Sequence, residues 1–137
     1  MLAISRYCLA IAFLSVSGVI AHAQSIREVK ATPGKDVRVG VYVNIRPDCT
    51  SGPLPSIRLA VPPEHGAVTV KRGTLKATNL KQCLAAEVPA FVAFYRAANG
   101  YNGADAFALE INSAGGHRAL QRFQVNVIGN QAGGQGI

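Results

Sequence analysis

The side chains of this sequence that could perform chemistry are few and widely spaced. Beyond residue 23 they are Cys49 and Cys83, His65 and His117, and the aspartate Asp105. Asp105 stands where a glycine-rich turn meets an alternating apolar segment. An acid in that place could bind calcium, take part in acid–base chemistry or tie down a turn. These three roles correspond to a calcium-binding repeat, an enzyme and an inert binding scaffold.

Asp105 lies in GYNGADAFALEI, residues 100–111. Calcium takes about six to eight oxygen ligands, usually with several carboxylates. The other aspartates beyond residue 23, Asp36 and Asp48, are far away in sequence, although the fold could bring either of them close. We therefore expect Asp105 to be structural and to accept backbone N–H groups of its own turn, with Gly103 supplying a permissive backbone before it.

The histidines give two opposed predictions. His65 follows Glu64 in a proline turn, where we expect adjacent side chains to diverge, so we predict that His65 and Gly66 are turn residues. His117 follows two glycines in a predicted hairpin loop and should be solvated. The alternative is an exported carrier of a small ligand or of copper or zinc that uses His65 and His117. No local His-x-His spacing supports such a metal site.

Motifs typical of enzymes are missing from the sequence. It contains neither a G-x-S-x-G nucleophile elbow nor a phosphate-binding glycine loop. Acid–base catalysis also needs positioned carboxylates or a partnered histidine. We therefore expect no enzymatic activity, no catalytic residue, no bound metal and no cofactor.

Residues 1–23 are typical of a secretory signal peptide. Arg6 supplies a positive charge, residues 9–20 are almost wholly apolar, and Ala21 and Ala23 form a small-x-small cleavage site. The apolar run is shorter than the roughly 20 residues that a spanning helix needs. We predict cleavage after Ala23, a secreted chain in the periplasm or outside the cell, and no membrane span in the mature form.

Cleavage would leave 114 of the 137 residues and only two of the three cysteines, Cys49 and Cys83. An isolated pair in an oxidising compartment is most simply a disulfide. The bridge would close 33 intervening residues. The chain-entropy treatment gives such a loop roughly 3–4 kcal/mol of stabilisation.

The charge of the chain is positive but dispersed. Removal of Arg6 changes the formal net charge from +7 to +6, and the densest basic group is Lys71, Arg72, Lys76 and Lys81. A nucleic-acid-binding surface would combine a stripe of Lys and Arg with aromatic residues. We expect a solvated basic face and no nucleic-acid partner. Another envelope protein or an anionic surface polymer is the expected partner class.

Apolar residues recur with period two, which indicates β-strands. The expected strands fall near residues 26–31, 36–46, 56–61, 66–71, 91–96, 105–111 and 121–128, with Gly- and Pro-rich turns between them. The expected inward residues are Val37, Val39, Val41, Val43 and Ile45 in the second strand, Ile57, Leu59 and Val61 in the third, Val68 and Val70 in the fourth, Phe107, Leu109 and Ile111 in the sixth, and Phe123, Val125 and Val127 in the seventh. FVAFYR is apolar on both faces and should be a central strand.

Two segments carry a family resemblance. PPEHGAVTV resembles the proline–x–histidine–glycine turn of bacterial Ig-like or cadherin-like repeats of secreted adhesins. YRAANGYNGADAFALEI resembles the aromatic, glycine and aspartate signature of the same repeats, and the resemblance covers roughly residues 55–128. The signature residues here are Tyr95, Tyr101, Gly103, Asp105 and Phe107. After Ile111, where the family often has an acid followed by glycine, this chain has Asn112-Ser113-Ala114.

The resemblance and the strand pattern together imply an all-β fold, an antiparallel Ig-like (Greek-key) β-sandwich of about seven strands. We expect a signal peptide at 1–23, a single domain at 24–130 and a flexible Gly-rich tail at 131–137. The expected function is a secreted, non-catalytic binding or structural module of the bacterial envelope or cell surface.

Overall fold

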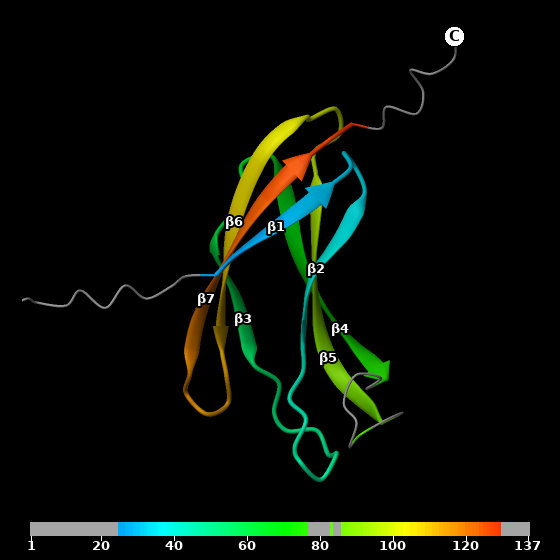
Figure 1. Cartoon of the computed structure of the whole chain (residues 1–137), viewed down its shortest axis with the longest axis vertical. Coiled ribbons are helices and arrows are strands. Elements are labelled where there is room, and N and C mark those ends of the chain that lie inside the picture. Colours follow the sequence, from blue (N-terminus) through cyan, green and yellow to red (C-terminus); the bar gives the residue numbers. More distant parts are fainter. Residues whose placement is uncertain (1–24, 77–82, 84–85, 130–137) are drawn as a thin grey trace, which may run out of the picture.

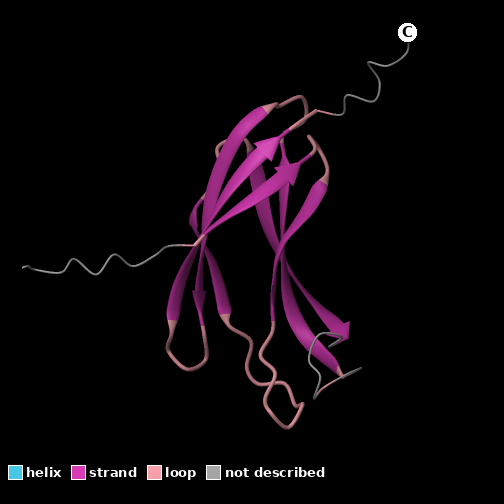
Figure 2. Ribbon diagram, in the orientation of Figure 1, coloured by secondary structure: helices cyan, strands magenta, loops and turns pink. Residues whose placement is uncertain are grey.

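The computed structural model describes residues 25–76, 83 and 86–129. The predicted signal peptide and the predicted tail at 131–137 lie outside the described residues. Within the described ranges the chain forms strands, turns and loops and no helix, so none of these residues forms a helix that could cross a membrane. Figure 2 shows this all-β character.

Seven strands form two sheets, as in a β-sandwich, and this confirms the predicted all-β class (Figure 1). One sheet has the order β1-β7-β6-β3 and the other has the order β2-β5-β4. The strands are β1 (Ile26–Ala31), β2 (Asp36–Tyr42), β3 (Ser56–Val61), β4 (Gly66–Lys76), β5 (Glu87–Ala97), β6 (Gly103–Asn112) and β7 (Arg118–Val127).

The core lies between the two sheets. Its largest fully buried side chains include Tyr95 from β5, Phe107 from β6 and Phe123 from β7. Their rings form a stack, with centroid distances of 5.6 Å between Tyr95 and Phe107 and 4.5 Å between Phe107 and Phe123. Such aromatic contacts add about 0.5–1.5 kcal/mol each to what burial alone contributes. The predicted inward faces of β6 and β7 are thus confirmed.

Strand β5 is the centre of its sheet, as its two apolar faces predict. It pairs with β4 along eleven register positions, from Gly66↔Ala97 to Lys76↔Glu87, and with β2 on the other side. All pairings among the strands are antiparallel except that of β1 with β7, which is parallel.

The alternation predicted for the second strand is wrong beyond Val39. A bulge between Arg38 and Gly40 adds one residue, and a one-residue shift moves the following side chains to the opposite face. Val41 is consequently 39% exposed, whereas Tyr42 packs against the core. The hydroxyl of Tyr42 donates a hydrogen bond to Gln121 of the other sheet at 2.7 Å. The strand also ends at Tyr42, so that Val43 and Ile45 lie in the following loop.

A second bulge corrects the prediction for β3. The register shifts between Leu59 and Val61, and Val61 is 47% exposed opposite Ala108. Leu59 faces Leu109 but remains 39% exposed because β3 is an edge strand. In β4, Val68 packs on the core whereas Val70 is 41% exposed.

Cys49 and Cys83 form the predicted disulfide, with their Cα atoms 5.3 Å apart. Cys49 belongs to the loop between β2 and β3, and Cys83 to the connection between β4 and β5. The bridge therefore fixes the loop between β2 and β3 to the connection that joins the end of β4 to the start of β5. Within the loop, Asp48 accepts hydrogen bonds from the backbone N–H and hydroxyl of Thr50, which stabilise its turn.

Candidate functional site

Asp105 is the third residue of β6 and points into the molecule. It is 7% exposed and is the one buried charged side chain in the described part of the chain. Alternation along β6 sends Asp105 inward together with Phe107 and Leu109, which are also buried. A carboxylate in such a place is stable only when protein donors replace the water that it loses.

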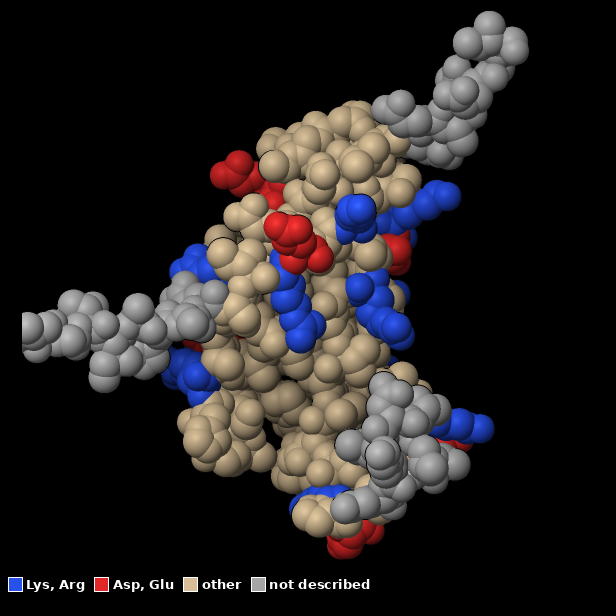
Figure 3. Space-filling view, viewed as in Figure 1, with Lys and Arg blue, Asp and Glu red and all other residues tan. Residues whose placement is uncertain are grey.

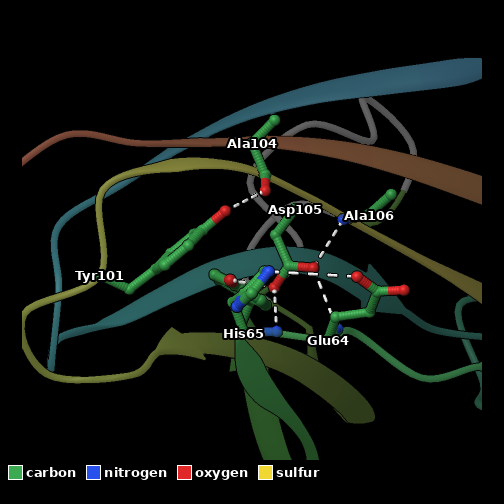
Figure 4. Close-up of polar contacts among 7 residues, drawn as sticks. Glu64, His65, Tyr101, Ala104, Asp105 and Ala106 are labelled. Atoms are coloured by element: carbon green, nitrogen blue, oxygen red, sulfur yellow. Dashed lines mark hydrogen bonds and ion pairs between the residues drawn. The ribbon is translucent and has the colours of Figure 1, made fainter.

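Four donors surround the Asp105 carboxylate (Figure 4). Oδ1 accepts the backbone N–H of Glu64 at 3.0 Å and that of Ala106 at 2.9 Å. Oδ2 accepts the backbone N–H of His65 at 3.1 Å and the hydroxyl of Tyr95 at 2.6 Å. A single side chain of β6 thus joins the other sheet, through Tyr95, and the loop that leads from β3 to β4.

The four bonds use the full acceptor capacity of the group. An ionised carboxylate offers about four lone-pair positions on two oxygens, and each oxygen here accepts two hydrogen bonds. A cation would have to displace protein donors in order to reach Asp105. No group of three or more His, Cys, Asp or Glu side chains with metal-binding geometry exists among residues 25–76, 83 and 86–129.

The same contacts determine the protonation of the pair. Burial acts to raise the pKa of Asp105, but the hydrogen bonds from Tyr95 and from the N–H groups of Ala106, Glu64 and His65 outweigh it and lower the pKa below its usual value. Burial raises the pKa of Tyr95 strongly, and the hydrogen bond to Asp105 raises it further. In the stable state Asp105 is therefore ionised and Tyr95 is neutral. The Tyr95 hydroxyl donates a hydrogen bond to the carboxylate and keeps its proton.

The donors of Asp105 differ from those that the sequence suggested. Its own turn, residues 100–103, was expected to supply the N–H groups, whereas Glu64 and His65 supply two of them from about 40 positions earlier. Only Ala106 is a neighbour in sequence. Sequence reasoning identified Tyr95 and Asp105 as parts of one signature but missed their direct bond and missed the role of Glu64.

Residues around this network connect the loop between β3 and β4 with the loop between β5 and β6. The ring of His65 stacks on Tyr101 with centroids 4.0 Å apart and planes 8° from parallel, and the carbonyl of His65 accepts the N–H of Ala98 at 2.8 Å. The hydroxyl of Tyr101 donates to the carbonyl of Ala104. Gly103 has φ = 136°, a conformation that residues with a side chain rarely adopt.

Gly66 is needed for a close approach. A Cβ atom at this position would lie 2.5 Å from the carbonyl oxygen of Arg96 and 2.8 Å from the ring of Tyr95. The small residue allows β4 to begin directly against β5 and keeps the preceding N–H groups within reach of Asp105. The residues predicted to be turn-structural, His65, Gly66, Tyr95, Tyr101, Gly103, Asp105 and Phe107, thus gather around one end of the sandwich.

His117 lies away from this cluster. It ends the loop between β6 and β7, where its carbonyl accepts the N–H of Ser113. His65 contacts Asp105 near the start of β6, and the seven residues from Asp105 to the end of that strand span roughly 23 Å. One molecule therefore cannot bring both imidazoles to a single copper or zinc ion, whose nitrogen ligands lie about 2 Å from the metal.

Two open hollows flank the loop that carries Glu64 and His65. One, of about 490 Å³, is lined by this loop and by residues that include Gly34, Arg96 and Asn99. The other, of about 420 Å³, is lined by residues that include Val61 and Gln124. Arg96 is engaged in an ion pair with Asp36 at 2.8 Å. Both hollows are shallow and lie beside the loop that Asp105 holds through the N–H groups of Glu64 and His65.

Charged side chains are interspersed over the face shown in Figure 3, where acidic residues lie among the basic ones. Several are paired. Arg58 contacts the carboxylate of Glu110 at 3.1 Å, and Arg118 lies 3.9 Å from the same carboxylate. The hydrogen bond from Arg58 and that from Asn112 lower the pKa of Glu110. The described residues visible in Figure 3 form no single continuous basic stripe.

The sequence matches no protein-family model and no curated protein.

Proposed function

We propose that the chain is a secreted, non-catalytic binding or structural module of the bacterial envelope or cell surface, located in the periplasm or outside the cell. Its partner class is another envelope protein or an anionic surface polymer. The observation that carries the proposal is that the Asp105 carboxylate accepts four hydrogen bonds from protein groups, which fill its four acceptor positions. This polar cluster of the described residues links the two sheets and a loop inside the molecule, which suits a rigid scaffold that presents its outer surfaces.

The disulfide supports an exported location. Bonds of this kind persist in oxidising compartments and are rare in the cytosol, and Cys49 and Cys83 are bridged. We further propose that the two sheets form an Ig-like Greek-key sandwich. The stack of Tyr95, Phe107 and Phe123 between the sheets supports a sandwich core. The sheet orders support the Greek-key assignment, because the connections β2–β3, β3–β4 and β5–β6 cross from one sheet to the other.

Capture from envelope extract tests the module. The oxidised mature chain is immobilised, and the retained material is compared with that held by the same chain after reduction and unfolding. A module predicts a saturable partner that the folded chain retains and the unfolded chain does not. Absence of such a partner, or equal retention by both forms, would contradict the proposal.

A thermal melt separates the module from the carrier alternative. A carrier predicts that one equivalent of Cu²⁺ or Zn²⁺ raises the melting temperature, and that the rise disappears in both His65→Ala and His117→Ala. The proposed module predicts no rise in the wild type.

A further inference from the structure

Strand β4 differs from the other three edge strands of the molecule. The sheet orders place β1, β3, β2 and β4 at edges. β1 and β3 have six residues each, and β2 has seven. β4 has eleven, and its register with β5 contains no shift from Gly66 to Lys76.

Long regular edges present unpaired N–H and C=O groups in a row and invite another strand. The bulges in β2 and β3 interrupt such a row, and the short length of β1 limits it. Within the part of the chain that the structure describes, no strand pairs with the second edge of β4. Among the edge strands of the described residues, β4 is therefore the best template for strand addition.

The side chains of β4 determine what kind of strand fits. Lys71, Arg72 and Lys76 are exposed, and β4 contains no acidic residue. Two copies of β4 would bring like charges together, which is unfavourable for directly opposed cross-strand residues. An acidic strand would instead form opposite-charge pairs, which are favourable. Charge complementarity thus selects a foreign acidic segment over a second copy of this chain.

The register gives the pattern of that segment. Arg72 points to the same face as Val70, because residues two positions apart on a strand share a face. Their partners on β5 are Phe91 and Ala93. Lys71 points to the opposite face, where its Nζ lies 5.3 Å from the centroid of the Phe94 ring. A bound strand would place an apolar residue opposite Val70 and acids opposite Lys71 and Arg72.

We propose that β4 is a docking edge for an extended acidic segment of a partner protein, which adds to the β2-β5-β4 sheet as a fourth strand. The inference rests on the proposed function, since it names the partner class of the module. Main-chain hydrogen bonds would provide affinity, and Lys71, Arg72 and Lys76 would provide selectivity.

The test uses an eleven-residue synthetic peptide of β-forming residues with valine opposite Val70 and glutamate opposite the three cations, measured by calorimetry on the full mature chain. Lys71→Glu/Arg72→Glu should weaken binding about tenfold or more. The control Lys30→Glu/Arg38→Glu makes the same change in net charge on exposed residues of β1 and β2 and should have a much smaller effect. Equal weakening by both pairs would overturn the proposal.

Backbone pairing is tested by N-methylation of the peptide at alternate residues. Methyl groups on the edge that faces β4 should abolish binding, whereas methyl groups on the opposite edge should leave it unchanged. Equal binding of the two methylated peptides would overturn strand addition. If the peptide fails to bind while an envelope partner is still captured, the docking edge is wrong and the module remains.

Discussion

The hydroxyl of Tyr95 donates to the carboxylate of Asp105 at 2.6 Å, and this bond connects the two sheets through the core. Tyr95 is completely buried and Asp105 nearly so. Hydrogen bonds to charged groups contribute about 1.5–3 kcal/mol, more than neutral ones. Because the carboxylate also accepts N–H groups of the loop before β4, loss of Asp105 affects the sheet packing and the loop together.

Two substitutions of Asp105 should lower the free energy of unfolding by different amounts. Asp105→Asn keeps one oxygen, but its amide N–H₂ must face at least one backbone N–H, that of His65 or those of Glu64 and Ala106. We expect a loss of about 1–3 kcal/mol in the free energy of unfolding. Asp105→Ala leaves four donors unpaired and should lose more. Urea denaturation measures both values.

A calcium site predicts another pattern. Asn and Ala would then be similarly harmful, and EDTA would lower the melting temperature of the wild type until calcium is restored. We expect EDTA to leave the melting temperature unchanged, since Asp105 has no free acceptor position.

Stability should be highest between about pH 5 and pH 9. The lowered pKa of Asp105 means that its contribution is complete above its unfolded value near 4 and is lost as pH falls through the folded pKa. The raised pKa of Tyr95 means that its contribution is complete below about pH 10 and is lost as pH rises through the folded pKa. We call these losses of stability the acid arm and the alkaline arm of the pH profile. Urea midpoints measured across pH follow both arms.

The variant Tyr95→Phe assigns these arms. It removes one alkaline titration and also a bond that lowers the pKa of Asp105, so both arms should become shallower. Tyr42, whose pKa is raised by burial, keeps part of the alkaline arm. Glu110 and Asp48 keep part of the acid arm, because hydrogen bonds lower their pKa values. A profile identical to that of the wild type would contradict the assignment.

Reduction of the Cys49–Cys83 bridge should destabilise the chain without abolishing the strands. The closed loop, with a sequence separation of 34, corresponds to roughly 3–4 kcal/mol. Thiol labelling of unreduced, denatured protein should detect no free sulfhydryl in the mature chain. The double variant Cys49→Ser/Cys83→Ser should reproduce the reduced protein and should not respond to reductant.

Two glycines of β4 provide a matched pair of substitutions. Gly66→Ala places a Cβ atom 2.5 Å from a backbone carbonyl oxygen and should cost several kcal/mol, of the order seen for severe overpacking. Gly73→Ala meets nothing within 4 Å and should be neutral or slightly stabilising. Equal melting temperatures for the two variants would refute the close approach at Gly66.

Period-two patterning in the sequence predicted the strands, the central position of β5 and the inward faces of β6 and β7, because burial on one face leaves a direct trace in residue types. The bulge at Arg38/Gly40 left no such trace. The run from Val37 to Ile45 alternates without interruption and favours a strand without a bulge, whereas the reversal at Val41 arises from the pairing with β5. The donors of Asp105 were also missed, because sequence patterns report near neighbours and Glu64 and His65 lie about 40 positions away.

The parallel pairing of β1 with β7 has a mechanical consequence. Six register pairs, from Ile26↔Arg122 to Ala31↔Val127, join the first and last of the described strands. Because the strands run in the same direction, tension applied before Ile26 and after Val127 pulls them past each other along their length. The hydrogen bonds are then loaded in shear and must break together, whereas an antiparallel pair pulled at one end would unzip bond by bond. The geometry of these two strands makes the domain resistant to stretching along its own chain.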